Sequence, residues 1–259
     1  MNISFSKYHG AGNDFIVIDN RTERHVLSPS QVQFLCDRHF GIGSDGLILI
    51  ESPSKAEVAF DMVFYNPDGS QSLCGNGSRC AVSFAHSLGI IGNNAYFLAY
   101  DGVHTSGISE ESIYISMKEV QEIVEYENGD YFLNTGSPHH ICYQWPQEDE
   151  FLERSMLIRH SEIYEPSGTN VNFVREIDAQ TIEIRTFERG VEAETLACGT
   201  GVTAAALSFA YRKQELNEVN VLAKGGSLKV SFVRKGPKYF SDIILSGPAK
   251  FVFSGQIEL

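Results

Sequence analysis

The sequence predicts an α+β protein made of two similar halves, each rich in strands and built around one helix. The first reason is an internal repeat, because CGNG at residues 74–77 recurs as CGTG at residues 198–201, an offset of 124 residues. Three more places agree on this offset: Gly12 with Gly136, Asn13 with Ser137, and GSDGLILI from residue 43 with SGTNVNFV from residue 167. A repeat of two long units favours two halves related by a pseudo-twofold axis over a solenoid, which needs more and shorter units.

The second reason is that both halves show the same order of elements. Strands are predicted in the first half at residues 15–19, 47–52 and 57–66, from apolar runs and partial alternation. A helix is predicted from Gly75 to about Gly89, because apolar residues recur there at helical spacing and Gly89 is a typical stop signal. The second half repeats this order, with strands at residues 169–174 and 181–188 and then a helix with the apolar stripe Val202, Ala205, Ala206, Phe209 and Ala210.

One more helix and several more strands complete the expected elements. Ser28 is typical of a helix N-cap and Pro29 of the first helical position, which predicts a helix from there to about Phe40. The remaining strands are expected at residues 112–117, 121–126, 139–143, 227–233 and 242–245. No linker rich in Pro or Gly separates the halves, so the repeat phase alone places their boundary near residues 117–120.

Composition excludes several classes of protein. The 259 residues carry 20 Lys and Arg against 33 Asp and Glu, a net charge of −13, so a general nucleic-acid binder or a protein of anionic membrane surfaces is not expected. The N-terminus shows no signal-peptide pattern and the chain contains no run of apolar residues long enough to span a bilayer. The five cysteines are an odd number in a long chain, which predicts reduced thiols in a cytoplasmic protein.

Two of these cysteines occupy a special position, because Cys74 and Cys198 each stand at the predicted start of a helix and precede Gly-X-Gly. Unsatisfied N–H groups at a helix start stabilise an anion, and such a site can lower a thiol pKa from ~8.5 to ~3.5–7.5. The anion can be the thiolate or a substrate carboxylate held by the amides of residues 75, 76, 199 and 200, namely Gly75, Asn76, Gly199 and Thr200.

Two equivalent thiols across a pseudo-twofold axis suit a reaction that is itself nearly symmetric. In racemisation or epimerisation, one group removes a proton from a carbon while another returns a proton to the opposite face. Two helix N-termini directed at the neighbouring carboxylate would stabilise the charge that develops in the transition state. The other cysteines, Cys36, Cys80 and Cys142, are interpreted as core residues. No CxxC or HExxH motif supports a metal site or a dithiol redox centre, so no metal is expected.

The motifs together resemble one known family. The segments KYHGAGNDFIVID, YNPDGS followed by CGNGSRC, GTNVNFV, and FERG followed by ETLACGTG resemble diaminopimelate epimerase over nearly the whole chain, in order. The resemblance implies two pseudo-symmetric domains, each a mixed, mostly antiparallel sheet wrapped around a central helix. For this chain it implies an N-terminal epimerase half at residues 1–117 carrying Cys74, a C-terminal half at residues 118–248 carrying Cys198, and a segment at residues 249–259 that returns to the N-terminal half.

The resemblance also implies an activity and a site. The family interconverts LL-2,6-diaminopimelate and its meso form in lysine and peptidoglycan-precursor biosynthesis, with a thiolate and a thiol as base and acid and with no cofactor. Cys74 and Cys198 would be these catalytic groups, and His139 and Glu188 would tune them, Glu188 also accepting from the reacting ammonium group. The residues implied to hold the far end of the substrate are Asn13, Asn66, Asn170 and Arg189. A homodimer is implied as well.

Some positions depart from the family pattern. Ser137 stands where many members have Asn, and Gly46 stands where some members have a Gln that touches the substrate. The segment between Arg189 and Glu194 is one residue longer than the common form, and the loop between Asp68 and Cys74 is one shorter. These differences lie in loops beside the expected site and leave both thiols in place.

Two other hypotheses stay open at this point. One is another two-cysteine racemase, acting on proline or hydroxyproline, against which Arg189 and the Asn residues favour a substrate with a second zwitterion. The other is a thiol redox or binding protein whose cysteines only cap helices, which the absence of CxxC disfavours. The expected partner is a small-molecule substrate, diaminopimelate, rather than a nucleic acid or a membrane.

Overall fold

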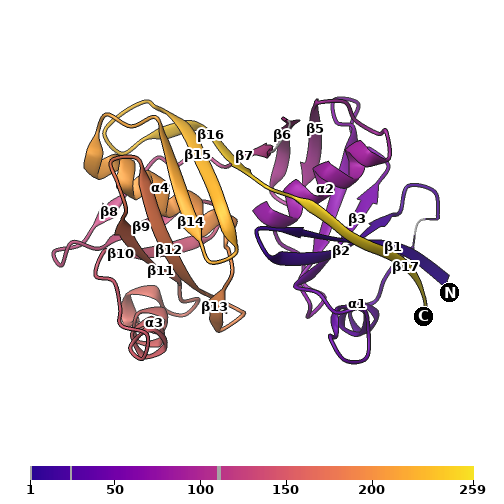
Figure 1. Ribbon diagram of the computed structural model, residues 1–259, viewed down its shortest axis with the longest axis horizontal. Coiled ribbons are helices and arrows are strands. Elements are labelled where there is room, and N and C mark those ends of the chain that lie inside the picture. Colours follow the sequence, from indigo (N-terminus) through magenta and orange to yellow (C-terminus); the bar gives the residue numbers. More distant parts are fainter. Residues whose placement is uncertain (1, 24, 110–111) are drawn as a thin grey trace. The chain divides into compact units, whose positions relative to one another are not determined.

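The structure is a computed structural model that describes residues 2–23, 25–109 and 112–259 (Figure 1). The chain divides into two compact units: unit 1 contains Met1–Ile115 and Gly247–Leu259, and unit 2 contains Ser116–Ser246. The chain therefore leaves unit 1 after Ile115 and its last segment comes back to that unit. No helix in the described part of the chain is long and apolar enough to cross a membrane.

Unit 1 is a mixed sheet with two helices. Its strands are β1 (Asn2–Gly10), β2 (Asn13–Asp19), β3 (Gly46–Glu51), β4 (Phe60–Tyr65), β5 (Asn94–Ala99), β6 (Gly102–Ile108), β7 (Ile113–Ser116) and β17 (Lys250–Glu258). The helices are α1 (Pro29–Cys36) and α2 (Gly75–Ser87). The pairs β2–β3 and β4–β5 are parallel, whereas β17–β1, β1–β2, β3–β4, β5–β6 and β6–β7 are antiparallel.

The two helices of unit 1 explain why the central strands are apolar on both faces. Ile16 of β2 and Leu47 of β3 belong to one buried cluster with Val32 and Leu35 of α1. On the other face, Phe15 and Ile48 lie against α2, because a Cβ atom added at its Gly77 would be 3.3 Å from Cδ1 of Ile48 and 3.5 Å from Cε1 of Phe15. Strands β2 and β3 therefore read as continuous apolar runs rather than as an alternating pattern.

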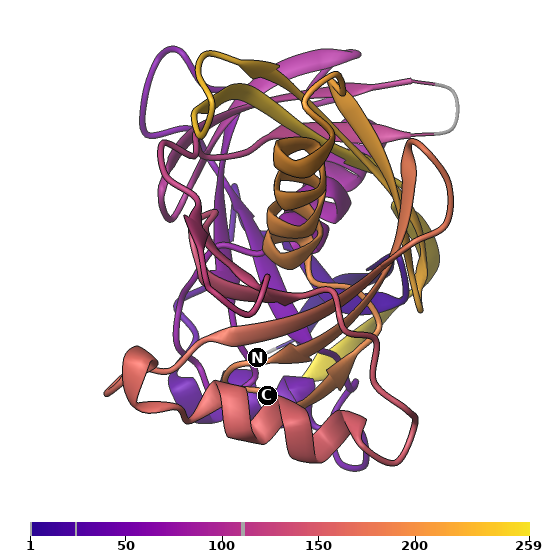
Figure 2. The same cartoon turned by 90° about the vertical axis from the view of Figure 1, so that its left-hand side faces the viewer.

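Unit 2 repeats this arrangement. Its strands are β8 (Val124–Glu125), β9 (Tyr131–Asn134), β10 (Pro138–Cys142), β11 (Asn170–Glu176), β12 (Thr181–Glu188), β13 (Ala193–Thr195), β14 (Glu218–Ala223), β15 (Gly226–Arg234) and β16 (Phe240–Gly247). Its helices are α3 (Phe151–Arg159), the 3-10 helix η1 (Glu162–Tyr164) and α4 (Gly199–Lys213). Figure 2 shows α4, in orange, with strands of unit 2 on several sides. Helix α3 packs on the outer face, where Phe151 joins Phe173 of β11 and Phe187 of β12 in a buried cluster.

The internal repeat extends to the pairing of the strands. The parallel, antiparallel, parallel, antiparallel series of β2 to β6 recurs for β10, β11, β12, β14 and β15. Adding 124 to the residue numbers of β5 gives those of β14, and adding 124 to those of α2 gives a range inside α4. The predicted fold class, with a mixed and mostly antiparallel sheet around a central helix in each half, is confirmed.

Several local predictions were wrong. Helix α1 ends at Cys36 and not near Phe40, because Asp37 leaves the helical conformation and its Oδ1 accepts from the backbone N–H of His39 and Phe40, each at 2.7 Å. Of the strand expected at residues 121–126, only Val124–Glu125 pairs as β8. The elements that the sequence did not predict are α3, η1, β1, β5, β6, β9, β13, β14 and β17.

Candidate active site

Cys74 is the N-cap residue of α2. Its backbone is extended, with φ −129° and ψ 111°, and its Sγ accepts a hydrogen bond from the backbone N–H of Gly77 at 3.4 Å. The side chain is half-buried, whereas the next residues, Gly75 and Asn76, are buried. The sulfur thus lies among the N–H groups of the first helical turn, where an anion is stabilised.

Three polar residues continue from Cys74 into unit 1. Oδ1 of Asn13 accepts from Sγ of Cys74 at 3.8 Å and from Nδ2 of Asn76 at 3.2 Å. Nδ2 of Asn13 in turn donates to the carboxylate of Asp45 at 2.8 Å, which fixes the orientation of the amide. Oδ1 of Asn76 accepts from Nη2 of the fully buried Arg79 at 2.7 Å. The structure therefore brings the predicted residues Asn13, Cys74 and Asn76 together.

Asn66 is bound to the loop that precedes Cys74. Its Nδ2 donates to Oγ of Ser70 at 3.0 Å and to Oγ of Ser72 at 3.2 Å, so the amide holds the loop that leads from β4 to Cys74. Its backbone N–H also donates to the carbonyl of Ser70 at 2.8 Å. The role that the structure gives Asn66 is the shaping of this shortened loop.

Cys198 is the N-cap residue of α4 and its surroundings differ from those of Cys74. The side chain is buried, with φ −116° and ψ 113°, and Sγ lies 3.4 Å from Oγ1 of Thr200. Oγ1 of Thr200 also lies 2.9 Å from Nε2 of His139, and the carbonyl of Thr200 accepts from Oγ1 of Thr135 at 2.8 Å. Thr200 thus links the second thiol to the predicted histidine.

The state of His139 follows from its neighbours. Oδ1 of Asn172 accepts from Oγ1 of Thr186 at 3.0 Å, which turns Nδ2 of Asn172 toward Nδ1 of His139 at 3.1 Å. Nδ1 is therefore an acceptor, and Nε2 carries the hydrogen and donates it to Thr200. Burial first, and then the charge of Arg189, lower the pKa of His139 to about 3. The imidazole is therefore neutral at physiological pH.

The remaining predicted residues of unit 2 meet around Asn170. Nδ2 of Asn170 donates to Oγ of Ser137 at 2.9 Å and to the carbonyl of Pro138 at 2.8 Å. Its Oδ1 accepts from the backbone N–H of Arg189 at 2.9 Å, and Nη1 of Arg189 donates to the carbonyl of Ser167 at 3.4 Å. Glu188 is the last residue of β12, directly before Arg189. Ser137 thus takes part in the site through its hydroxyl.

The departure at Gly46 has a packing reason. A Cβ atom at Gly46 would lie 2.4 Å from Cε2 of Phe64 and 3.0 Å from the carbonyl oxygen of Tyr65. Phe64 is the partner of Ile48 in the pairing of β4 with β3, and its ring lies over the glycine. A side chain at position 46 is therefore incompatible with this placement of Phe64.

The other three cysteines, Cys36, Cys80 and Cys142, are not N-cap residues of a described helix. All five cysteines are free, and burial raises the pKa of Cys36 and of Cys80 and raises that of Cys142 to about 11. Thiols with raised pKa values are poor bases and nucleophiles at neutral pH. In the described part of the chain, no three His, Cys, Asp or Glu side chains lie close enough together to hold a metal ion.

The residues of these networks that sequence reasoning missed include Arg79, Asn172 and Thr186. Arg79 and Asn172 both lie inside the motifs CGNGSRC and GTNVNFV. Asn172 stands two residues after Asn170 on β11, so the period of a strand places both side chains on the same face. That periodicity is the signal that could have found it.

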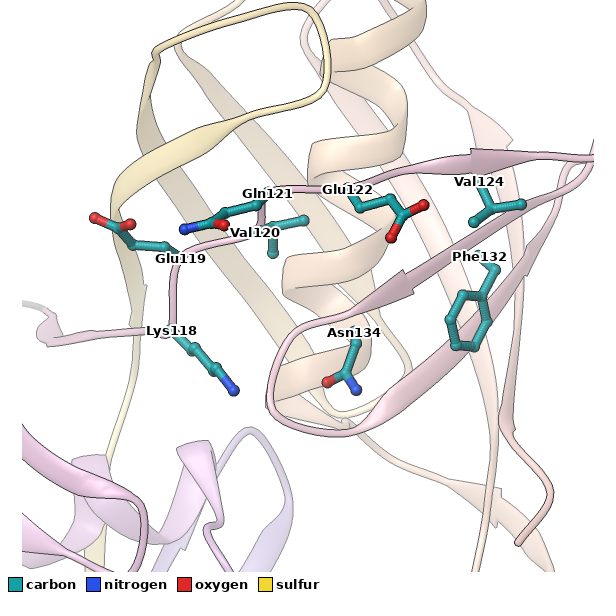
Figure 3. Close-up of a pocket in the computed structure, with 8 residues that line it drawn as sticks. All are labelled: Lys118, Glu119, Val120, Gln121, Glu122, Val124, Phe132 and Asn134. Carbon is teal, nitrogen blue, oxygen red and sulfur yellow. The ribbon is translucent and has the colours of Figure 1, made fainter. Parts of the chain in front are cut away.

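A separate cavity of about 510 Å³ lies in unit 2 (Figure 3). It is lined by Lys118, Glu119, Val120, Gln121, Glu122, Val124, Phe132 and Asn134, and so contains neither thiol nor any predicted site residue. Figure 3 shows these side chains on the segment before β9 and on β9 itself. The mixture of charges gives no preference for one sign of ligand.

Comparison with known sequences gives one consistent result. The family model described as diaminopimelate epimerase matches residues 5–132 and again residues 131–252. A protein of that name from Flavobacterium psychrophilum is 46% identical over 97% of this chain and 98% of its own length. The corresponding values are 43%, 96% and 99% for one from Chlorobaculum tepidum, and 38%, 98% and 98% for one from Aquifex aeolicus.

Comparison with solved structures shows the fold. A phenazine biosynthesis protein of the PhzF family from Bacillus anthracis superposes with a TM-score of 0.77 at 14% identity, over 100% of both chains. A hydroxyproline epimerase from Agrobacterium vitis gives a TM-score of 0.74 at 14% identity, over 100% of this chain and 93% of that one. The same two-unit fold therefore serves proteins with different names.

Proposed function

Because this chain belongs to the diaminopimelate epimerase family, we propose that Cys74 and Cys198 are the base and acid with which it inverts one α-carbon of its substrate. The enzyme is an isomerase that interconverts LL-2,6-diaminopimelate and the meso form in lysine biosynthesis.

The observation that carries this assignment is the equivalence of the two thiols. Each is the N-cap residue of the central helix of its unit, each precedes Gly-X-Gly, and the two are related by the repeat offset. The three other thiols are buried with raised pKa values. The pair at the helix starts lies beside the N–H groups of a first helical turn and has polar neighbours, Asn13 at Cys74 and Thr200 at Cys198.

The proposed reaction moves two protons and no electrons. A thiolate takes the α-hydrogen as a proton, so that a C–H bond breaks, an S–H bond forms and the electron pair stays on the carbon. The opposite thiol then gives its proton to the other face of that carbon and becomes the thiolate. Each turnover thus exchanges the roles of Cys74 and Cys198, and the reverse reaction starts from the new state.

The negative charge that develops next to the α-carbon needs stabilisation. Removing a proton there shifts electron density onto the substrate carboxylate. We assign the carboxylate to the backbone N–H groups of the two first helical turns, which belong to Gly75, Asn76, Gly199 and Thr200. N–H donors that are fixed before the reaction and meet the developing charge favour the transition state over the bound substrate.

His139 acts in this proposal as a neutral hydrogen-bond donor. With Nδ1 occupied by Asn172, its Nε2–H donates to Thr200, whose own hydroxyl hydrogen is then available to Sγ of Cys198. A neutral donor directed at Sγ stabilises the thiolate of Cys198. Because it adds no positive charge, Cys198 can still take up a proton and act as the acid. Glu188 is assigned to the ammonium group on the reacting carbon.

The far end of the substrate carries a second ammonium and carboxylate group. Arg189 can pair with a carboxylate, and Asn13, Asn66 and Asn170 can donate or accept around a zwitterion. Nη1 of Arg189 donates only to a carbonyl at 3.4 Å in the described contacts, so its charge is available to a ligand. Both proton transfers use groups of the chain itself, so the proposed mechanism uses neither pyridoxal phosphate nor a metal.

Substrate choice separates this proposal from the racemases of similar fold. Proline and hydroxyproline have no second zwitterion, so they would leave Arg189 without a carboxylate. We expect the purified enzyme to invert diaminopimelate and to leave proline unchanged when both are assayed side by side. Faster racemisation of proline than of diaminopimelate would contradict the proposed substrate. The Arg189→Leu variant should lose affinity for diaminopimelate and keep its fold, as judged by circular dichroism.

We also propose a cytoplasmic homodimer. The five free thiols support a reducing compartment. Strand β17 pairs with β1 and presents Phe251, Val252 and Phe253, each about half exposed, which supports contact with a second copy. Light scattering after size-exclusion chromatography should give twice the mass of the chain. A monomer at all working concentrations would contradict this part of the proposal.

A further inference from the structure

Arg79 is the one fully buried arginine of unit 1 in the described part of the chain, and its guanidinium is poorly satisfied. Nη2 donates to Oδ1 of Asn76 at 2.7 Å, whereas Nε and Nη1 have no hydrogen-bond partner. Burying a charged group without full pairing is strongly destabilising, because the charge loses its hydration and gains too few partners. Such a residue needs an explanation beyond packing.

The position of Arg79 on the helix makes its charge still more costly. Side chains of a helix point toward its N-terminus, so the guanidinium lies back against the first turn, where it meets Asn76. Strand β1 covers it there, because a Cβ atom at Gly10 would lie 3.5 Å from Nη2. The N-terminal turn already carries the positive end of the helix dipole, so a cation at this place is stabilised only by an anion nearby.

Cys74 is the group that can supply that anion. Burial lowers the pKa of Arg79 to about 10, and the charges of Cys80 and Cys74 act in the opposite direction. At neutral pH Arg79 is therefore still a cation. Burial raises the pKa of Cys80, so that Cys80 stays a neutral thiol. Of the two sulfurs that act on Arg79, Cys74 is then the one whose thiolate can face the cation.

We propose that Arg79 is a positioning residue of the epimerase reaction: it holds Asn76 and, through Asn76 and Asn13, the side chain of Cys74, and its charge favours the thiolate of Cys74. This inference rests on the acid/base role proposed above for Cys74. Arg79 touches no substrate in this account.

The hydrogen bonds around Cys74 show why a charge is needed. Oδ1 of Asn13 is an acceptor, so it stabilises the thiol, which can donate to it at 3.8 Å. The thiolate loses that bond and keeps the donor N–H of Gly77 at 3.4 Å. The cation of Arg79 compensates for this loss, so that both protonation states of Cys74 are accessible. A group that alternates between base and acid requires this balance.

Other ionisable groups at this end of α2 are already paired. Asp45 reaches Asn13 and pairs with Arg38 at 2.7 Å, and Asp14 pairs with Arg38 at 2.7 Å and with Lys7 at 2.6 Å. From β1, His9 accepts from the backbone N–H of Gly12 at 3.3 Å. The charges of Lys7 and Arg38 are largely balanced by those of Asp14 and Asp45, whereas two nitrogens of the Arg79 guanidinium have no hydrogen-bond partner.

The second unit handles its thiol differently. The repeat offset carries Arg79 onto Thr203, whose hydroxyl donates to the carbonyl of Gly199 at 2.9 Å and carries no charge. There the neutral chain of His139 and Thr200 reaches Cys198 instead. The two thiols are therefore equivalent in the backbone and unequal in electrostatics.

The test measures the thiolate of Cys74 without any substrate. Iodoacetamide reacts with the thiolate, forming an S–C bond and releasing iodide, so its rate against pH gives the titration midpoint of each cysteine by mass spectrometry of its peptide. The variants are Arg79→Met, which removes the charge, and Arg79→Lys, which keeps a charge. The matched control is Arg21→Met, which removes a cation that pairs with Asp19 in the same unit.

We expect Arg79→Met to raise the midpoint of Cys74 by about one pH unit, which makes alkylation about tenfold slower at pH values well below the parental midpoint, with a smaller rise for Arg79→Lys. Arg21→Met should leave the midpoint unchanged. An unchanged midpoint in folded Arg79→Met, or an equal shift in Arg21→Met, would overturn the inference.

A measurement on the unaltered protein covers the case in which Arg79→Met does not fold. Its Cys74 should titrate below ~8.5, the value of a free thiol, and a midpoint at or above that value overturns the inference. Because no substrate is present, a shift in alkylation without epimerase activity would count against the proposed function and leave the role of Arg79 intact.

Discussion

Nδ2 of Asn172 donates to Nδ1 of His139 across 3.1 Å, and this hydrogen bond decides which ring nitrogen carries the proton. The amide is held in this orientation from its other side by the hydroxyl of Thr186. Burial keeps the ring neutral, so Nε2–H faces Thr200 and, beyond it, Cys198. Asn172 on β11 thus determines the tautomer of His139 on β10, and this tautomer is part of the environment of Cys198.

Replacing Asn172 should disturb Cys198 through His139. In Asn172→Asp a carboxylate faces Nδ1 and favours the doubly protonated ring, which places a charge where the parent enzyme has none. We expect kcat/KM to fall by about tenfold to a hundredfold and to recover partly at higher pH, where the ring loses its second proton. Thr186→Val is the matched control and should cost less. A parental pH profile in Asn172→Asp would contradict the relay.

The low pKa of His139 predicts how acid affects stability. The folded protein holds this ring neutral down to about pH 3, whereas the unfolded chain takes up a proton near pH 6.5. The unfolded state binds more protons in that window, so the stability from this group is complete above pH 6.5 and is lost as pH falls toward 3. Urea unfolding of the parent and of His139→Gln at mildly acidic and neutral pH measures this. An equal loss of stability in both proteins would contradict it.

The clash at Gly46 predicts a coupled pair. Gly46→Ala forces a Cβ atom against the ring of Phe64, and such overpacking costs about 1–3 kcal/mol of unfolding free energy. The cost should shrink in the Phe64→Leu background, which makes room beside β3. Gly92→Ala serves as a control, because a Cβ atom there meets nothing within 4 Å. Additive effects of the two substitutions in denaturant unfolding would show that the two positions are not coupled.

Ser137 should matter for binding more than for the proton transfers. Its hydroxyl accepts from Asn170, which also receives the backbone N–H of Arg189. Ser137→Ala removes one of these anchors, so we expect KM to rise several-fold with kcat nearly unchanged. Ser137→Asn, which restores the residue common in the family, should keep KM close to the parental value. A fall in kcat without a change in KM would show a different role.

The sequence was sufficient for the two central helices, for the strands just before them and for the thiols at the helix starts. The two helices were found because Gly-X-Gly motifs and apolar stripes are local signals. The repeat could have supplied more, since an offset of 124 residues carries α1 onto the region of α3 and β5 onto β14. Helix α3 has no side-chain cap, and only Phe151 and Ser155 are buried in it, so no stripe marks it.

Other features depend on contacts between distant segments. Strand β17 is half exposed over Phe251 to Phe253 and is fixed by its pairing with β1, which lies at the other end of the chain. The tautomer of His139 requires Asn172 and Thr186 from two different strands. The burial of Arg79 follows from the passage of β1 over α2. None of these relationships leaves a local pattern, because each joins residues far apart in sequence.

The most direct test of the two-thiol mechanism is turnover of LL-diaminopimelate in deuterium oxide by the parent enzyme and by Cys74→Ala and Cys198→Ala. The parent should place deuterium at the inverted carbon of the first meso product, because the proton it delivers comes from a thiol that exchanges with solvent. Each Ala variant should stay folded and lose inversion by about 10²–10⁴-fold, the usual contribution of an acid or base. Inversion at the parental rate by either Ala variant would contradict the account.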